Sequence, residues 1–500
     1  MNRCMLFVAV SVLLAWTSTA QTPVKRSASG RPNIIFIYAD DLGYGELGCY
    51  GQRKIRTPHL DKMASEGVRL ESFYSSSALC APARCQWLTG LHSGHAAVRA
   101  NHELANGPDS FTDLLEKGQM PLPAGSVTIA RQLQQAGYAT ALIGKWGLGM
   151  ADTEGAPLKH GFDYFFGYLD QKQAHNYYPT HLWENDRQYP LPNPSLRVHT
   201  RVSPEQINDS VFNAFIGNRY SVDAMAEKAE TFIRQQQAKP FFLYYALTLP
   251  HLALQVPAEA RAAYEGVFPE TPYLGEKGYC PSRFPRATYA AMVTYLDDKV
   301  GELLNLLQRL GLEDNTLVVF SSDNGSAFRT GGADPEFFQV SGPLRNFKGA
   351  LYEGGIRVPF IARWPGKLNP AVVTTPAAGY DLFATFAEVA DVPPFTSTDG
   401  RSMWPLLTGK RFRSHGFFYF ELMEYGGQQA VRMGDWKAVR RNMLADPQSP
   451  WELYDLKSDI GETRDVAGRH PEIVMRAQAI AGREHRSALL REWDFMIPSR

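Results

Sequence analysis

The chain has 500 residues, 44% of them hydrophobic, and a formal net charge of zero at pH 7. This length and composition suffice for a large buried core in one large domain, with or without a small second domain. The balanced charge provides no bulk attraction toward nucleic acid or an anionic membrane surface, so we expect neither as a partner.

Residues 1–20 have the layout of a secretory signal peptide. Arg3 supplies the positive start, residues 6–16 are apolar, and Ser-Thr-Ala at 18–20 is a small-residue cleavage site. The apolar stretch is short for a membrane span, which disfavours the alternative of a retained anchor. We therefore expect an exported protein, periplasmic or extracellular, with no membrane attachment after signal removal.

Residues 33–39 read Asn-Ile-Ile-Phe-Ile-Tyr-Ala, a continuous apolar run typical of a parallel strand buried on both faces. Asp40 and Asp41 follow directly. Adjacent carboxylates at the end of a buried strand repel each other, so they are costly unless a cation or a basic partner neutralises them. A solvated turn with an Asp cap is the alternative for such a pair by itself.

Residues 80–90 read Cys-Ala-Pro-Ala-Arg-Cys-Gln-Trp-Leu-Thr-Gly. A buried structural cysteine beside a turn proline would explain Cys80 and Pro82, but neither Arg84 nor the Leu-Thr-Gly ending. We expect a helix to open at residues 84–88. Its amino end would place N–H groups and positive dipole near an anionic group bound at residue 80.

This stretch closely resembles the signature of the type I sulfatases, in which the Cys of Cys-x-Pro-(Ser/Ala)-Arg is oxidised to the aldehyde formylglycine. The resemblance implies a formylglycine-generating maturation enzyme as a partner, with Cys80 working as an aldehyde hydrate. One hydroxyl of such a hydrate attacks sulfur, and loss of the other hydroxyl's proton then expels sulfate, whereas an ordinary Ser or Cys ester needs a second attack by water. Asp40 and Asp41 match the family's Asp pair, which binds a divalent cation.

Residues 138–143 predict another buried strand, which ends in Gly-Lys-Trp-Gly-Leu-Gly at 144–149. This resembles the Gly-Lys-Trp-His-Leu-Gly of the sulfatases, whose Lys contacts the hydrate and the sulfate, so Lys145 carries over. The family's His, which is thought to assist proton removal from the hydrate, is Gly147 here. We expect this glycine to leave room beside Trp146 for a bulky sugar ring.

The segment from 159 to 183 is rich in aromatic residues and histidines. Core packing best explains its Phe-rich first half. The second half interleaves polar residues with His175, His181 and Trp183. Because sites combine an apolar wall with convergent polar groups, these three are candidate substrate-binding residues, with core packing as the alternative.

Two further strand ends carry polar residues. His251 follows the predicted strand 240–247 and, although a lone histidine there is usually structural, it matches the sulfate-binding, proton-donating His of the sulfatases. Asp323 and Asn324 follow the predicted strand 316–320. They supply hard oxygen ligands suited to Ca²⁺ or Mg²⁺, and the sulfatases place their second ligand pair in such an Asp-Asn-Gly segment. An Asn-Gly turn is the alternative.

Lys348, in Leu-Arg-Asn-Phe-Lys-Gly, matches the second sulfate-binding lysine of the family. A solvated surface lysine is the alternative. With Arg84 and Lys145, it is expected to add positive charge for the transition state.

The carboxy-terminal part differs in pattern. Residues 393–410 have the Pro, Gly and Ser content of a linker, 417–420, 429–433 and 436–440 alternate like antiparallel strands, and 472–482 predict a helix. We expect a catalytic domain at 21–410 and a small α+β domain at 411–500. The cysteines at 49, 85 and 280 leave room for at most one disulfide.

Buried strands alternating with helices predict an α/β fold with its site at the carboxyl edge of the sheet. The resemblance implies an alkaline-phosphatase-like fold, a large, mostly parallel mixed sheet sandwiched by helices. It also implies hydrolysis of sulfate esters, which we expect on carbohydrates, with His251 protonating the leaving alcohol. Ca²⁺, or Mg²⁺, would be held by Asp40, Asp41, Asp323, Asn324 and the matured Cys80. The alternatives are a phosphomonoester or phosphonate hydrolase of the same superfamily, and a catalytically silent protein that binds sulfated sugars, which Gly147 raises.

Overall fold

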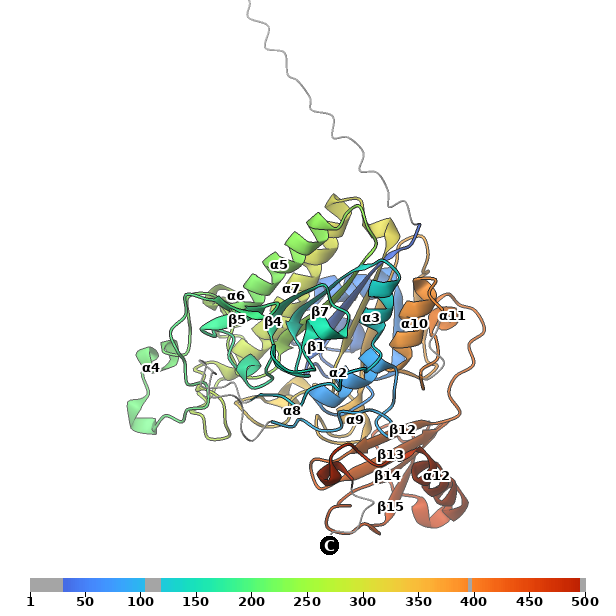
Figure 1. Cartoon of the computed structure of the whole chain (residues 1–500). Helices are drawn as coiled ribbons and strands as arrows, with labels where there is room; N and C mark the ends of the chain where they lie inside the picture. Colours follow the sequence, from blue (N-terminus) through green and yellow to red (C-terminus); the bar gives the residue numbers. More distant parts are fainter. Residues whose placement is uncertain (1–29, 104–117, 394–397, 495–500) are drawn as a thin grey trace, which may run out of the picture.

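A computed structural model describes residues 30–103, 118–393 and 398–494, and its largest element is an 11-stranded sheet (Figure 1). The predicted signal peptide lies outside these ranges. No helix in the described ranges is long and apolar enough to cross a membrane.

The sheet is mixed, with a parallel centre. Its order is β10-β2-β9-β8-β1-β7-β3-β4-β5-β6, with β11 paired to β2. The parallel centre consists of β8 (Thr316–Ser322), β1 (Asn33–Asp40), β7 (Phe241–Pro250), β3 (Ala139–Lys145) and β4 (Tyr164–Tyr168). Antiparallel pairing joins β9 (Arg357–Arg363) to β8 and to β2 (Val68–Tyr74), and joins β4, β5 (His181–Glu184) and β6 (Arg187–Pro190). The short β10 (Ala371–Val373) and β11 (Ala377–Ala378) run parallel to β2. The predicted mixed, mostly parallel sheet is confirmed.

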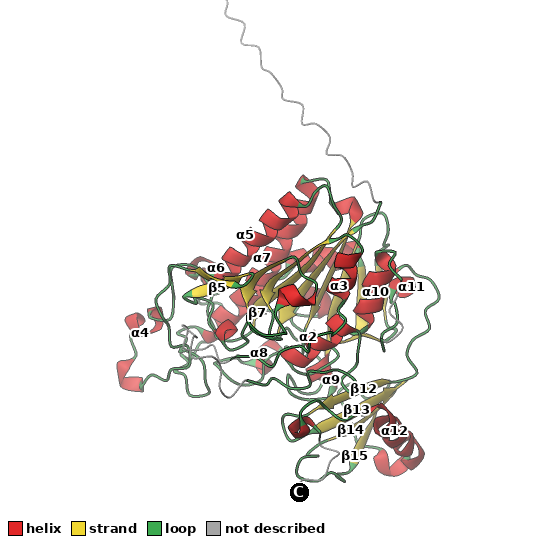
Figure 2. Cartoon of the chain, in the orientation of Figure 1, coloured by secondary structure: helices red, strands yellow, loops and turns green. Residues whose placement is uncertain are grey.

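Helices cover both faces of this sheet (Figure 2). Alternate residues of β1 point to opposite sides, so Ile35 and Ile37 enter one core while Ile34 and Phe36 enter the other. The first core is closed by α1 (Pro58–Glu66), α5 (Ser221–Gln235) and α7 (Pro285–Arg309). The second is closed by α2 (Cys80–Thr89), α3 (Ile129–Gln135) and α10 (Asp381–Val389). This double covering explains why all of β1 is buried and why its sequence is continuously apolar.

Shorter helices lie in the connections. They are α4 (Asp209–Asn213), α6 (Ala258–Ala262), α8 (Pro335–Phe338), α9 (Glu353–Ile356) and α11 (Trp404–Leu407). The segment 203–237 contains α4 and α5 with a non-helical connection between them.

The carboxy-terminal part forms a separate antiparallel sheet, shown in red below the main sheet in Figure 1. Its strands are β12 (Phe418–Leu422), β13 (Gln428–Met433), β14 (Trp436–Arg440) and β15 (Trp451–Asp455), and α12 (Pro471–Glu484) packs on it. Three strands and the helix were predicted, whereas β15 was not. Phe418 and Phe420 pack with Tyr74 and Tyr380, so an apolar cluster joins the small sheet to the large one.

The helix of the Cys-x-Pro-x-Arg segment begins earlier than predicted. Leu79 is still extended, and α2 starts at Cys80, not at Arg84. Pro82 is compatible with this start because the N–H groups of a first helical turn have no intrahelical partner to lose. Residue 80 is therefore itself the first residue of the helix.

Candidate active site

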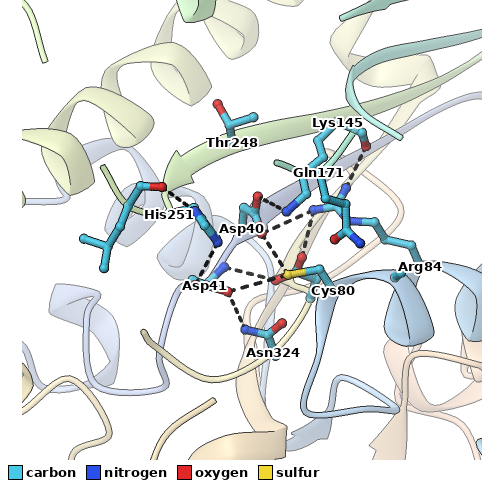
Figure 3. A network of polar contacts seen from close by, with 12 residues as sticks. Asp40, Asp41, Cys80, Arg84, Lys145, Gln171, Thr248, His251 and Asn324 are labelled. Atoms are coloured by element: carbon cyan, nitrogen blue, oxygen red, sulfur yellow. Dashed lines mark hydrogen bonds and ion pairs between the residues drawn. The ribbon is translucent and has the colours of Figure 1, made fainter. Parts of the chain in front are cut away.

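The residues predicted for catalysis and cation binding meet at the carboxyl edge of the sheet, and Figure 3 shows Asp40, Cys80 and His251 among them. Strand β1 ends at Asp40 and β3 ends at Lys145, while His251 follows β7 and Asp323 follows β8. Because these strands are parallel neighbours, their carboxyl ends lie together. The Asp41 N–H donates to Asp323 Oδ1 over 3.0 Å, which ties the two loops.

The centre of the site is a buried group of oxygen donors. Asp40, Asp41, Asp323 and Asn324 are each at most 2% exposed. Asp41 has a φ of 63°, a left-handed conformation that Asp tolerates better than most residues. Asn324 Nδ2 donates to Asp41 Oδ1 over 2.7 Å, whereas Asn324 Oδ1 is buried and has no hydrogen-bond partner among the described residues.

Three cationic side chains surround this group, each against a different carboxylate. The pairs are Lys145 Nζ with Asp40 Oδ2 at 2.7 Å, Lys348 Nζ with Asp41 Oδ1 at 2.7 Å, and Arg84 Nη2 with Asp323 Oδ2 at 2.8 Å. Burial opposes ionisation of Asp40. Nearby positive charges, Lys145 first among them, outweigh burial and hold the pKa of Asp40 well below its usual range. For Asp323, burial and the nearby Asp40 raise the pKa to about 7. Negative charge at Asp323 is therefore not fully compensated by the side chains present.

Cys80 lies against this group. Its Sγ is 3.4 Å from Asp40 Oδ1 and 3.3 Å from Lys348 Nζ. Burial, followed by the charge of Asp323, raises the pKa of the thiol well above its usual value. Because the thiolate is the nucleophilic form of cysteine, this environment disfavours ordinary thiol catalysis.

His251 faces the same centre. Its Nε2 is 3.5 Å from Asp41 Oδ2, and its Nδ1 is 2.5 Å from the carbonyl oxygen of Leu252. Since a carbonyl only accepts hydrogen bonds, the Nδ1 carries a proton. Burial lowers the pKa of His251 to about 4, so the ring is neutral at pH 7 without a bound anion.

A cavity of about 180 Å³ opens over these groups. Its floor includes Asp41, Cys80, Lys145, His251 and Lys348, and its wall includes Asn101, Gln119, Gln171, His175 and Tyr279. Arg84 is not one of the described residues that line the cavity. That side chain is fully buried and also donates to the Lys145 carbonyl oxygen over 2.8 Å.

Of the three predicted wall residues, the cavity includes only His175, whose ring stacks on that of His251 with centroids 4.9 Å apart. His181 and Trp183 lie on β5 and are not among the described residues that line the cavity. His181 is buried within hydrogen-bond distance of Gln173 and Thr180. His181 is buried and Trp183 packs half-buried against the second core, as the core-packing alternative expects.

The predicted room beside Trp146 does not exist. A Cβ built on Gly147 would lie 2.8 Å from Gln171 Cγ, so the Gln171 side chain fills the space. Trp146 is fully buried, and its Nε1 donates to the Gly155 carbonyl oxygen over 2.8 Å. The expectation that a sugar ring occupies this position is therefore wrong.

The sequence pattern gave a signal for one further wall residue, Gln171, but missed others. Gln171 lies in the polar part of the 159–183 segment, where interleaved polar residues were the available signal. Asn101, Gln119 and Tyr279 carry no comparable signal. In the part of the chain that the structure describes, the cysteines at 49, 80, 85 and 280 form no disulfide.

Comparison with known proteins gives consistent matches over both sheets. The Sulfatase family model matches residues 32–392, and a model of the N-sulphoglucosamine sulphohydrolase C-terminal region matches residues 346–479. Arylsulfatase A of Homo sapiens is 34% identical, with 89% of this chain and 85% of the relative covered. N-acetylgalactosamine-6-O-sulfatase of Bacteroides thetaiotaomicron is 29% identical, with 89% and 91% covered. The crystal structure of Ps i-CgsB matches with a TM-score of 0.74 at 26% identity, covering 92% of this chain and 95% of that one.

Proposed function

Because the chain belongs to the sulfatase family and is a sulfuric ester hydrolase, we propose that it removes sulfate from a carbohydrate, with residue 80 in its formylglycine form as the nucleophile. The observation that carries this proposal is the position of Cys80, 3.4 Å from Asp40 in a cavity with Lys145, Lys348 and His251. Maturation by a formylglycine-generating enzyme and export from the cytoplasm belong to the same proposal.

The described residues fit a divalent cation. Asp40, Asp41 and Asp323 supply carboxylate oxygens, and the buried Oδ1 of Asn324 has no other partner among the described residues. Such hard oxygen donors suit Ca²⁺, with Mg²⁺ as the second choice. When bound there, the cation supplies positive charge that orients residue 80 and neutralises sulfate oxygens.

The cationic side chains of the site have two different roles. Lys145 and Lys348 line the cavity, so they bind sulfate oxygens and stabilise the charge that develops as the ester breaks. Arg84 is a positioning residue, because it is buried behind the cavity wall and holds Asp323 and the backbone of Lys145.

His251 is assigned the proton transfer to the leaving alcohol. Its Nδ1–H donates to the Leu252 carbonyl oxygen, so Nε2 is the ring atom that can transfer a proton to the substrate. Burial disfavours the charged ring, but an anionic sulfate ester beside it favours the protonated form needed for a general acid. His175, stacked on His251, fixes the plane of that ring.

The wall of the cavity supports a carbohydrate substrate. Three side-chain amides, from Asn101, Gln119 and Gln171, line the cavity together with the rings of His175 and Tyr279. Amides exchange hydrogen bonds with hydroxyl groups, and rings pack on sugar faces. N-acetylgalactosamine-6-O-sulfatase among the relatives, and a structure of Ps i-CgsB with k-i-k-neocarrahexaose, point to the same substrate class.

The test is to compare turnover by the matured, cation-loaded protein of 4-nitrophenyl sulfate, 4-nitrophenyl phosphate and a set of galactose and N-acetylgalactosamine monosulfates. We expect sulfate release from at least one sugar and a large preference for sulfate over phosphate, both absent in Cys80→Ala. Faster cleavage of the phosphate ester would favour the phosphohydrolase alternative. No sulfate release from any substrate by fully matured protein would favour the silent sugar-binding alternative.

A further inference from the structure

Gln171 and Gly147 form a fitted pair at the wall of the cavity. Gly147 has a φ of +75°, and a Cβ there would lie 2.8 Å from Cγ and 3.1 Å from Cδ of Gln171. The glutamine is only 7% exposed and lines the cavity together with Cys80 and Lys145. Figure 3 shows its amide end turned toward the Cys80 side of the site. The glycine is needed because the side chain crosses directly over it.

The orientation of the Gln171 amide follows from its neighbours. Its Nε2 donates to Gln119 Oε1 over 2.9 Å and to Asn101 Oδ1 over 3.3 Å. The backbone fixes which atoms these partners present. Asn101 Oδ1 accepts from the Ala81 N–H over 3.0 Å, and Gln119 Nε2 donates to the Gly118 carbonyl oxygen over 3.1 Å. Two oxygens therefore face Gln171, so its nitrogen must face them.

The oxygen of the Gln171 amide takes no part in these hydrogen bonds. Gln171 Oε1 is buried and, within the described ranges, has no hydrogen-bond partner. Leaving a buried carbonyl unpaired costs about 1–3 kcal/mol, so the atom is suited to a donor that arrives from outside the chain. Sulfate oxygens cannot be that donor because they only accept. A neutral hydroxyl group can.

Resting on the proposed function, we propose that Gln171 is a specificity-determining residue whose Oε1 accepts a hydrogen bond from a sugar hydroxyl close to the sulfated carbon. The closeness follows from the network, because Asn101 joins Gln171 to the N–H of Ala81, the residue after Cys80. An amide oxygen is not a base, so Gln171 does not replace the histidine that is missing at Gly147. It selects for a substrate that carries the hydroxyl, since a site built to hydrogen-bond a hydroxyl discriminates against an analogue without it.

The experiment compares a sulfated sugar with its deoxy analogue. N-acetylgalactosamine 4-sulfate and 6-sulfate and the corresponding galactose sulfates are assayed with the wild type. The one that is turned over is then compared with its analogue lacking the hydroxyl nearest the sulfated carbon. We expect the wild type to prefer the parent sugar by about tenfold or more in kcat/KM, the effect of one buried hydrogen bond. Gln171→Met, which keeps the length of the side chain but removes the acceptor, should lower kcat/KM for the parent about tenfold and leave the analogue nearly unchanged.

Two further measurements separate this effect from misfolding. Gly147→Ala must displace the Gln171 side chain, so it should cause the same selective loss without changing residue 171. Calorimetry on Cys80→Ala protein measures sugar binding without turnover. In that background Gln171→Met should lower the affinity for the parent sugar and leave the affinity for its deoxy analogue unchanged.

Equal effects of Gln171→Met on both sugars, or an unchanged preference for the parent, would overturn the inference and indicate that Oε1 binds only water. Wild type that releases sulfate from 4-nitrophenyl sulfate but from none of the sugars would overturn the carbohydrate assignment and the inference with it.

Discussion

Lys437 of β14 lies 2.9 Å from Glu353 of α9, and both side chains are completely buried where the small sheet meets the large domain. Glu462 shares the same ammonium group at 3.1 Å. This ion pair therefore links the two sheets through charge, beside the apolar cluster of Phe418 and Tyr74.

Lys437→Met should strongly destabilise the protein, because it removes the buried ammonium group that the carboxylates of Glu353 and Glu462 share. Breaking a buried pair in this way costs about 3–5 kcal/mol in free energy of unfolding. Urea unfolding of wild type and variant measures the loss. Lys457→Met, at an exposed position, is the control and should change stability by no more than about 0.5 kcal/mol. Similar small effects for the two variants would show that the pair does not hold the sheets together.

His485 should make stability depend on pH. Burial opposes its charge, but the hydrogen bond and charge of Glu421, at 2.8 Å, raise its pKa above the ordinary value. A histidine with a raised folded-state pKa stabilises the fold below its unfolded pKa of about 6.5, and this contribution disappears as pH rises through the folded-state pKa.

The stability difference between wild type and His485→Gln should therefore be largest in mildly acidic solution and shrink toward alkaline pH. Thermal unfolding across that range measures it. A difference that grows with pH would contradict the assignment of charge to His485.

Asp323→Ala should remove the divalent cation that we propose for the site, and the sulfatase activity with it, as should Asp40→Ala. Each substitution deletes one carboxylate of a single group. Elemental analysis of purified protein should find about one Ca²⁺ per chain in wild type, the number expected for one set of oxygen ligands, and much less in the variants. Asp435→Ala, at an exposed position, serves as the control. Full metal content in both site variants would place the cation elsewhere.

Gly147→His, which restores the residue typical of the family, should be destabilising by about 1–3 kcal/mol because the added side chain overlaps Gln171. Shortening the neighbour relieves the overlap, so Gly147→His with Gln171→Ser should be more stable than the sum of the two single changes predicts. A double-mutant cycle on unfolding free energies checks this, with an expected coupling above about 0.5 kcal/mol. Strict additivity would mean that the two side chains do not compete for the space.

The floor of the site was largely predictable from the sequence. Asp40, Lys145 and Asp323 stand at the ends of apolar runs, and the carboxyl ends of neighbouring parallel strands meet at one edge of the sheet. Cys80 and Arg84 were recognised through a motif with fixed spacing. For these residues, local pattern and chain topology together determine the position.

The wall was less predictable because long connections determine it. Asn101 and Gln119 reach Gln171 from a segment with no periodic pattern, and nothing near Gly147 in the sequence indicates which distant side chain fills the space above it. His181 and Trp183 had the composition of a sugar-binding wall. Their strand β5 lies toward the edge of the sheet, and neither of these two side chains is among the described residues that line the cavity.

Whether residue 80 reacts as formylglycine is tested most directly by mass spectrometry of the peptide that carries it, on the same preparations in which sulfate release is measured. We expect the fraction of chains with an aldehyde in place of the Cys80 thiol to rise in proportion to specific activity when maturation is varied. Full activity in a preparation whose residue 80 is an intact thiol would contradict the proposed mechanism.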